Sequence, residues 1–141
     1  MAVANLFTGR SRRLKPRPLS PMPLLAGMRT DPHGKAVNNG VLLSLPEDEY
    51  SLMRPHLEPV ELPQYRVLYQ PAEKIEYAYF PNTGMTSLVI AVSDGRSVEV
   101  GIVGREGMVG TPLAAGLRSG PCQAIMQIAG NGVRIRSEVL Q

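Results

Sequence analysis

The stretch that decides the fold is MTSLVIAVSDGRSVEVGIV, residues 85–103. Two runs rich in β-branched residues flank the pair Asp94-Gly95, and this arrangement is the strongest short-range signal of a β-hairpin. In the second run apolar and other residues alternate, so we expect one face of that strand to be buried. The apolar residues that define this face are Val98, Val100 and Ile102.

The same period of two recurs on both sides of the hairpin. The further strand candidates are VEL (60–62), RVLY (66–69), YAYF (77–80), CQAIMQIA (122–129) and VRIR (133–136). Asn131-Gly132 is expected to turn the chain between the last two. The side chains expected inside are Ala124, Met126, Ile128, Val133 and Ile135. Short strands separated by glycine-rich turns predict a mostly β fold, an antiparallel β-roll or jelly roll with short flanking helices.

Ahead of these strands, residues 38–59 predict one or two short helices. Asn38 or Asn39 can cap the first helix, and Pro46 suits a first helical position. Three acids follow Pro46, where the helix dipole favours negative charge. The residues that recur at helical spacing, and should face the core, are Tyr50, Met53 and Leu57. At the other end of the chain, RSEVLQ (136–141) predicts the start of another helix with Ser137 as its cap.

Positive charge is concentrated at the N-terminus. Residues 1–40 contain seven Lys and Arg and one acid, a net charge of +6, and the remainder carries −3, which gives the total of +3. Residues 1–37 are also rich in proline, so we expect a disordered basic tail followed by a folded domain at 38–141. The basic stretch GRSRRLKPRP (9–18) could contact nucleic acid or an anionic surface, or simply be a solvated extension.

Several classes of protein are disfavoured by composition. No apolar run is long enough to span a bilayer, so we expect no membrane partner. The single cysteine, Cys122, excludes an internal disulfide and indicates the cytoplasm, and its place in an alternating run predicts an inert buried thiol. His33 and His56 are too few for a clustered metal site. We therefore expect no metal, no cofactor and no enzymatic activity.

Several segments together resemble a known family. They are LPEDEY (45–50), PHLEPVEL (55–62), VLYQPAEKIEYAYFPNTG (67–84), DGRSVEVGIVGREGMVG (94–110) and RIRSEVL (134–140). In order and spacing, over roughly 39–141, they are similar to the sensory domain of Crp/Fnr-type transcription regulators. The resemblance implies a cyclic-nucleotide-binding-like β-roll, then a long dimerisation helix and a winged helix-turn-helix. We expect only the roll here, with the chain truncated where dimerisation begins, and with DNA binding and homodimer formation belonging to the full-length protein.

The resemblance also places a ligand cradle at Gly110, Thr111, Arg118 and Ser119. In cyclic-nucleotide-binding members, a Gly-Glu pair binds the ribose through the glutamate and offers backbone N–H groups, and a later arginine neutralises the phosphate. Here Gly110 matches the glycine, whereas Thr111 replaces the glutamate and Pro112 has no N–H to donate. Arg118-Ser119 match the arginine pair. The implied cradle is half present.

The binding free energy lost with the missing contacts indicates what such a cradle can bind. Losing the bond to the ribose costs about 1.5–3 kcal/mol and losing one donor about 1 kcal/mol more. Together these losses weaken binding by roughly two to three powers of ten. We therefore expect no cyclic nucleotide to bind here, and we interpret the glycines of this stretch as corners of the roll. Arg118 then either pairs with an acid such as Glu106 or faces a different, small-molecule or anionic effector. The alternatives to a sensory domain are a stand-alone cyclic-nucleotide-binding-like module and a cupin-type jelly-roll enzyme.

Overall fold

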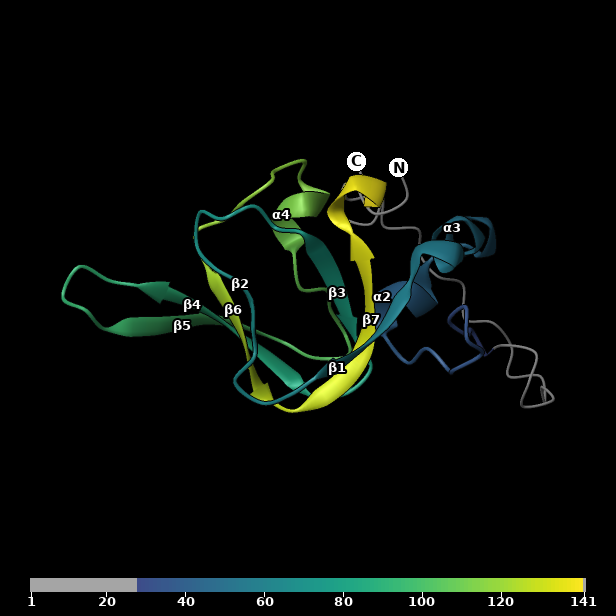
Figure 1. The fold of residues 1–141 in the computed structure, drawn as a ribbon, viewed down its shortest axis with the longest axis horizontal. Coiled ribbons are helices and arrows are strands. Elements are labelled where there is room, and N and C mark those ends of the chain that lie inside the picture. The colour runs from purple at the N-terminus through teal and green to yellow at the C-terminus, as the bar shows by residue number, and fades with distance from the viewer. Residues whose placement is uncertain (1–27, 141) are drawn as a thin grey trace, which may run out of the picture.

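The computed structural model describes residues 28–140, which form two antiparallel sheets flanked by short helices (Figure 1). The strand order is β1-β7-β3 in one sheet and β2-β6-β4-β5 in the other. The strands are β1 (Glu58–Leu62), β2 (Val67–Tyr69), β3 (Tyr77–Pro81), β4 (Met85–Ala91), β5 (Ser97–Val103), β6 (Gln123–Ile128) and β7 (Gly130–Arg136). The predicted mostly β antiparallel roll is confirmed.

Short helices precede, interrupt and follow the strands. They are α2 (Gly40–Ser44), α3 (Glu47–Met53), the 3-10 helix η1 (Arg54–His56), α4 (Thr111–Ala114) and the 3-10 helix η2 (Ser137–Leu140). Pro46 is the N-cap of α3, one position before the first helical position predicted for it. The three acids that follow it lie in the first turn, as expected. Tyr50, Met53 and Leu57 are buried as expected. No helix within residues 28–140 is long and apolar enough to cross a membrane.

The core is one cluster of apolar side chains from both sheets and from α2, α3 and α4. Its fully buried members include Leu42 of α2, Leu62 of β1, Phe80 of β3 and Met126 of β6. On β7, Val133 and Ile135 point inward and Arg136 outward, as the alternation predicted. The roll therefore buries the inner faces of both sheets against each other and against the helices.

The hairpin at Asp94-Gly95 is confirmed, but the burial predicted for its second strand is wrong. β4 pairs with β5, and Gly95 adopts a φ of +84° in the turn. The exposed fractions of the three apolar side chains are 47% for Val98, 53% for Val100 and 54% for Ile102. β5 is the edge strand of its sheet, and the loop end of the hairpin projects from the body at the left of Figure 1. No second layer covers this strand.

A β-bulge explains why the alternation misled. Leu88 faces Gly101 and Val89 faces Glu99, so Val100 is an extra residue on β5. Because a bulge interrupts the period of two, the strand changes face between Val98 and Ile102. A similar shift, from Met85↔Ile128 to Thr86↔Met126, interrupts the alternation of β6. Ala124 and Met126 are buried as predicted, whereas the side chain of Ile128, beyond the shift, is 54% exposed.

The turn predicted at Asn131-Gly132 is also wrong. Both residues lie inside β7, and only Ala129 separates β7 from β6. The two strands belong to different sheets, so Ala129 links one sheet to the other and does not close a hairpin. The Asn-Gly pair resembles a hairpin signal in sequence, but here the small residues serve a close backbone contact.

That contact is the corner of the roll, residues 82–84 against residues 128–132. Gly84 has a φ of +87°, and a Cβ on it would lie 2.7 Å from the Ile128 carbonyl oxygen. A Cβ on Gly130 would lie 2.1 Å from the Thr83 carbonyl oxygen, and one on Gly132 2.4 Å from that of Phe80. The β3–β4 and β6–β7 connections therefore pass between the sheets in mutual contact, and the positions of these three glycines leave no room for a side chain.

Asn39 joins the helices to this corner. Its Oδ1 accepts the N–H groups of Val41, at 3.0 Å, and Leu42, at 3.2 Å, and so caps α2 as predicted. Its Nδ2 donates to the carbonyl oxygens of Pro81 and Gly107, each at 2.8 Å. The side chain is fully buried, and its oxygen and its nitrogen each make two hydrogen bonds. The second role was not predictable from the sequence.

The folded part begins earlier than predicted. Residues 29–37, which we expected to be disordered, pack on the domain. Thr30 and Ala36 form an isolated antiparallel β-bridge, and Asp31 and Val37 are buried. The remainder of the predicted tail, residues 1–27, lies outside the described residues, so its disorder stays a prediction. At the other end, residues 137–140 form one 3-10 turn, and the buried Ser137 Oγ has no hydrogen-bond partner.

The corner predicts a contrast between two glycine substitutions. Gly132→Ala places a methyl group against the Phe80 carbonyl and should lower the free energy of unfolding by about 2–3 kcal/mol or more. Gly101→Ala, whose nearest neighbour would be Leu88 Cδ1 at 3.5 Å, should change it by less than about 0.5 kcal/mol. Urea unfolding of both variants is the measurement. Equal losses would contradict the close approach at the corner.

Candidate functional site

Gly110 opens the first half of the predicted cradle. It adopts a φ of +112°, immediately before α4, and a Cβ on it would lie 3.3 Å from the Ala78 Cα. Glycine therefore fits both the left-handed backbone and the close contact with β3. Thr111 is exposed, and Leu113 anchors α4 in the core with 5% exposure. The threonine hydroxyl thus lies at the surface, beside a fixed turn.

The structure brings the two halves of the predicted cradle together. The ring of Pro112 lies against Gly120, because a Cβ on Gly120 would be 3.0 Å from the Pro112 Cγ. The Leu117 N–H donates to the Pro112 carbonyl oxygen at 2.9 Å and closes the loop between them. Gly110, Thr111, Arg118 and Ser119 therefore belong to one compact surface segment, residues 110–120, which includes α4 and is here called the loop 110–120.

A second loop supports the first from behind. The Ile75 N–H donates to the Arg118 carbonyl oxygen at 2.8 Å, and the Ala72 N–H donates to that of Gly120 at 2.9 Å. Ala72 has a φ of +62°, a left-handed conformation that costs an L-residue roughly 1–2 kcal/mol. The loop at 70–76 therefore holds the Arg118 end of the site in place, with some backbone strain.

Arg118 is exposed and Ser119 is half-buried. Among the ion pairs of residues 28–140, none involves Arg118. The Glu106 carboxylate instead accepts the Gly104 N–H at 2.9 Å, and this bond is the main reason why the pKa of Glu106 is lowered. The Arg118–Glu106 pair considered from the sequence is therefore not present, and the guanidinium is open to solvent.

Tyr69 lies beneath this loop, and sequence reasoning did not identify it as part of the site. It is 8% exposed, and its pKa is raised to about 12, first because burial disfavours the phenolate and then because Cys122 lies beside it. The nearby backbone N–H of Gly110 favours the phenolate and opposes this shift. Cys122 itself is half-buried, not fully buried as predicted. Tyr69 is therefore a buried neighbour of Gly110 and Cys122 at the base of the loop.

The chemical capacity of the site is limited. Arg118 supplies one exposed cation, and Thr111 and Ser119 supply hydroxyl groups. Within residues 28–140 no three His, Cys, Asp or Glu side chains are grouped so that they could hold a metal ion. His56 ends η1, as expected for a helix terminus, and His33 lies in the N-terminal segment. The loop suits weak recognition of an anion.

Comparisons with known proteins identify the fold. No protein-family model matches the chain, and no curated protein matches it. It resembles a regulatory subunit of a cAMP-independent protein kinase A from Trypanosoma brucei (TM-score 0.62, 17% identity, 72% of this chain, 38% of that one). It also resembles a cyclic nucleotide-binding-like protein from Brucella abortus (TM-score 0.56, 21% identity, 71% and 85%).

A further likeness is to the N-terminal domain of a transcriptional regulator from Streptomyces coelicolor (TM-score 0.60, 18% identity, 71% of each chain). The chain thus spans 38% of the length of the trypanosome protein and most of the two bacterial structures. At these identities the likeness concerns the fold. The expected cyclic-nucleotide-binding-like β-roll is confirmed. One of these similar structures is a domain of a transcriptional regulator.

Tyr69→Phe should change the alkaline stability of the protein. The unfolded chain ionises Tyr69 near pH 10, whereas the folded chain keeps it protonated up to about pH 12. The contribution of this group is therefore complete below pH 10 and is lost as the pH rises to 12. In urea unfolding, wild type should lose up to about 2–3 kcal/mol relative to the phenylalanine variant across that interval. Parallel pH profiles would show that Tyr69 is not buried.

Proposed function

We propose that this chain is the sensory domain of a Crp/Fnr-like transcription regulator. It converts occupancy of the surface loop 110–120 into the position of the segment that begins at Ser137. It is not an enzyme, it acts in the cytoplasm, and it reaches DNA through a domain outside this sequence, as part of a homodimer. The observation that carries the proposal is a continuous hydrogen-bonded connection from the loop to Ser137.

The connection runs through the supporting loop at 70–76. The Ile75 N–H donates to the Arg118 carbonyl oxygen. The backbone carbonyl oxygen of the next residue, Glu76, accepts the Ser137 N–H at 2.9 Å. Lys74 Nζ lies 3.8 Å from Glu138 Oε1 of η2, an exposed pair that adds little energy but marks the proximity. Any displacement of Arg118 by a ligand therefore acts on the start of η2 through three consecutive residues, 74–76.

The effector is a small anion other than a cyclic nucleotide. Thr111 cannot replace a carboxylate on a ribose, and Pro112 has no N–H to donate. The structurally similar regulatory subunit from Trypanosoma brucei belongs to a cAMP-independent protein kinase A, so the fold is compatible with a protein that does not respond to cAMP. Arg118 remains as the exposed cation that an anion would approach.

Calorimetry with cyclic AMP and cyclic GMP tests the state of this loop. Wild type should bind with a Kd no better than roughly 0.1 mM, because two contacts are missing. The double variant Thr111→Glu with Pro112→Leu should bind more tightly, since it restores the carboxylate and a donor. Adding Arg118→Ala should abolish that gain, because the phosphate loses its counter-charge.

Two outcomes would contradict this account. Micromolar binding by wild type would show that the cradle functions as it stands. No gain in the double variant would show that Arg118 is not placed to meet a phosphate, and the stretch 110–120 would then be a structural corner. Sequencing the gene beyond codon 141 distinguishes the sensory domain of a regulator from a stand-alone binding module. A helix-turn-helix downstream would support the regulator, and a stop codon would support the stand-alone module.

A further inference from the structure

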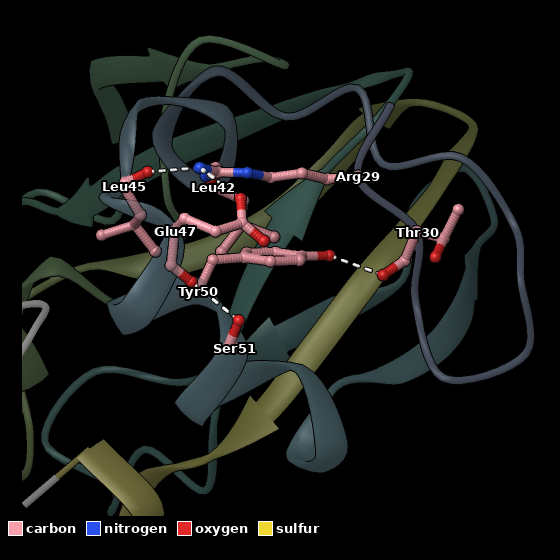
Figure 2. A network of polar contacts seen from close by, with 7 residues as sticks. All are labelled: Arg29, Thr30, Leu42, Leu45, Glu47, Tyr50 and Ser51. Carbon is pink, nitrogen blue, oxygen red and sulfur yellow. Dashed lines mark hydrogen bonds and ion pairs between the residues drawn. The ribbon is translucent and has the colours of Figure 1, made fainter. Parts of the chain in front are cut away.

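Residues 29–37, here called the strap, lie against α2, α3 and η1 and are held there by two arginines. The Arg29 guanidinium donates to the carbonyl oxygen of Leu42 and to that of Leu45, the latter at 2.5 Å (Figure 2). These carbonyls lie at the end of α2, where the helix offers no partner of its own. The Arg29 Cζ also lies 4.8 Å from the centre of the Tyr50 ring.

The helices hold the strap in return. Arg54 donates from Nε to the Thr30 carbonyl oxygen at 2.8 Å and from Nη2 to that of Asp31 at 2.9 Å. The Tyr50 hydroxyl donates to the same Thr30 oxygen at 2.7 Å (Figure 2). One arginine thus extends from the strap to the helices and another from the helices to the strap.

These ties are polar, and apolar burial contributes little. Val37 is the buried apolar side chain of the strap, at its last residue. The buried Asp31 uses its Oδ1 to accept the N–H groups of His33 and Lys35, which shapes the strap without fixing it to the roll. A polar cavity of about 100 Å³, lined by Asp31, Lys35 and Glu61 among others, lies between the strap and β1.

We infer that the strap is a latch. It holds α2 and α3 in position and opens without unfolding of the roll, and Arg29 and Arg54 are its positioning residues. Segments held by few apolar contacts and by exchangeable hydrogen bonds open locally at a lower free energy than the whole domain. The latch gives the helices a control that is separate from the loop 110–120, and the inference stands whether or not that loop binds an effector.

Hydrogen–deuterium exchange on the full chain tests the latch. Arg29→Ala and Arg54→Ala should each accelerate exchange of the amides at 40–54 by about tenfold to a hundredfold, because charge-assisted bonds are lost. The amides of β6 and β7 should exchange as in wild type. Arg29→Lys keeps the charge but not the two-carbonyl fork, so it should show most of the effect.

Arg96→Ala is the matched control, since Arg96 pairs with Asp94 at the exposed hairpin tip and should leave exchange at 40–54 unchanged. Three results would overturn the inference. The first is unchanged exchange in the Arg29 and Arg54 variants. The second is equal acceleration throughout the chain, which would make the arginines general stabilisers. The third is failure of all three variants to fold, lysine variant included, because the strap would then be inseparable from the roll.

Discussion

The side chain of Asn39 is the interaction on which the arrangement of helices and sheets depends. Its oxygen caps α2, and its nitrogen bridges the end of β3 and the turn before Met108. Pro81, one of its partners, immediately precedes the glycine-lined corner where both connections pass between the sheets. Since a buried carbonyl without a donor costs about 1–3 kcal/mol, losing this one amide would leave helix, sheet and turn unsatisfied together.

Two further polar systems lie toward the two ends of the described chain. On one side, Arg29 and Arg54 bind the strap to α2 and α3, with apolar burial confined to Val37. On the other, the backbone of the loop at 70–76 connects Arg118 to Ser137. Both systems consist of hydrogen bonds at the surface of a well-packed core. Such bonds can be exchanged locally while the core persists, as the proposed sensory role would require.

Much of the fold followed from the sequence, and the errors have identifiable causes. The hairpin at Asp94-Gly95, the cap at Asn39 and the roll itself were predictable because local signals and tertiary structure agree. Val98 and Ile102 were not, because a bulge at Val100 breaks the period of two and no layer covers an edge strand. A one-residue shift of pairing leaves no trace in composition, and the same holds for the β6 shift that exposes Ile128.

The candidate site rests on a different kind of reasoning. The resemblance assigned Gly110, Thr111, Arg118 and Ser119 to a ligand cradle; the backbone holds residues 110–120 in one compact segment, and the binding role of these residues stays a prediction. The resemblance gave no sign of Tyr69, because a tyrosine at the end of a short strand looks like any core aromatic, and its nearness to Gly110 and Cys122 arises only in the folded chain. Nor did proline-rich composition reveal that residues 29–37 pack, since their ties are to backbone carbonyls far along the chain.

Asn39→Ser tests the central role of this residue most directly. Serine caps a helix about as well as asparagine, so the variant keeps α2 capped and removes only the bonds to Pro81 and Gly107. We expect one cooperative urea transition with a loss of about 2–4 kcal/mol, because two buried carbonyls lose their donor. A loss below about 1 kcal/mol would show that Asn39 acts as an ordinary cap, and that the helices and sheets are held together by other means.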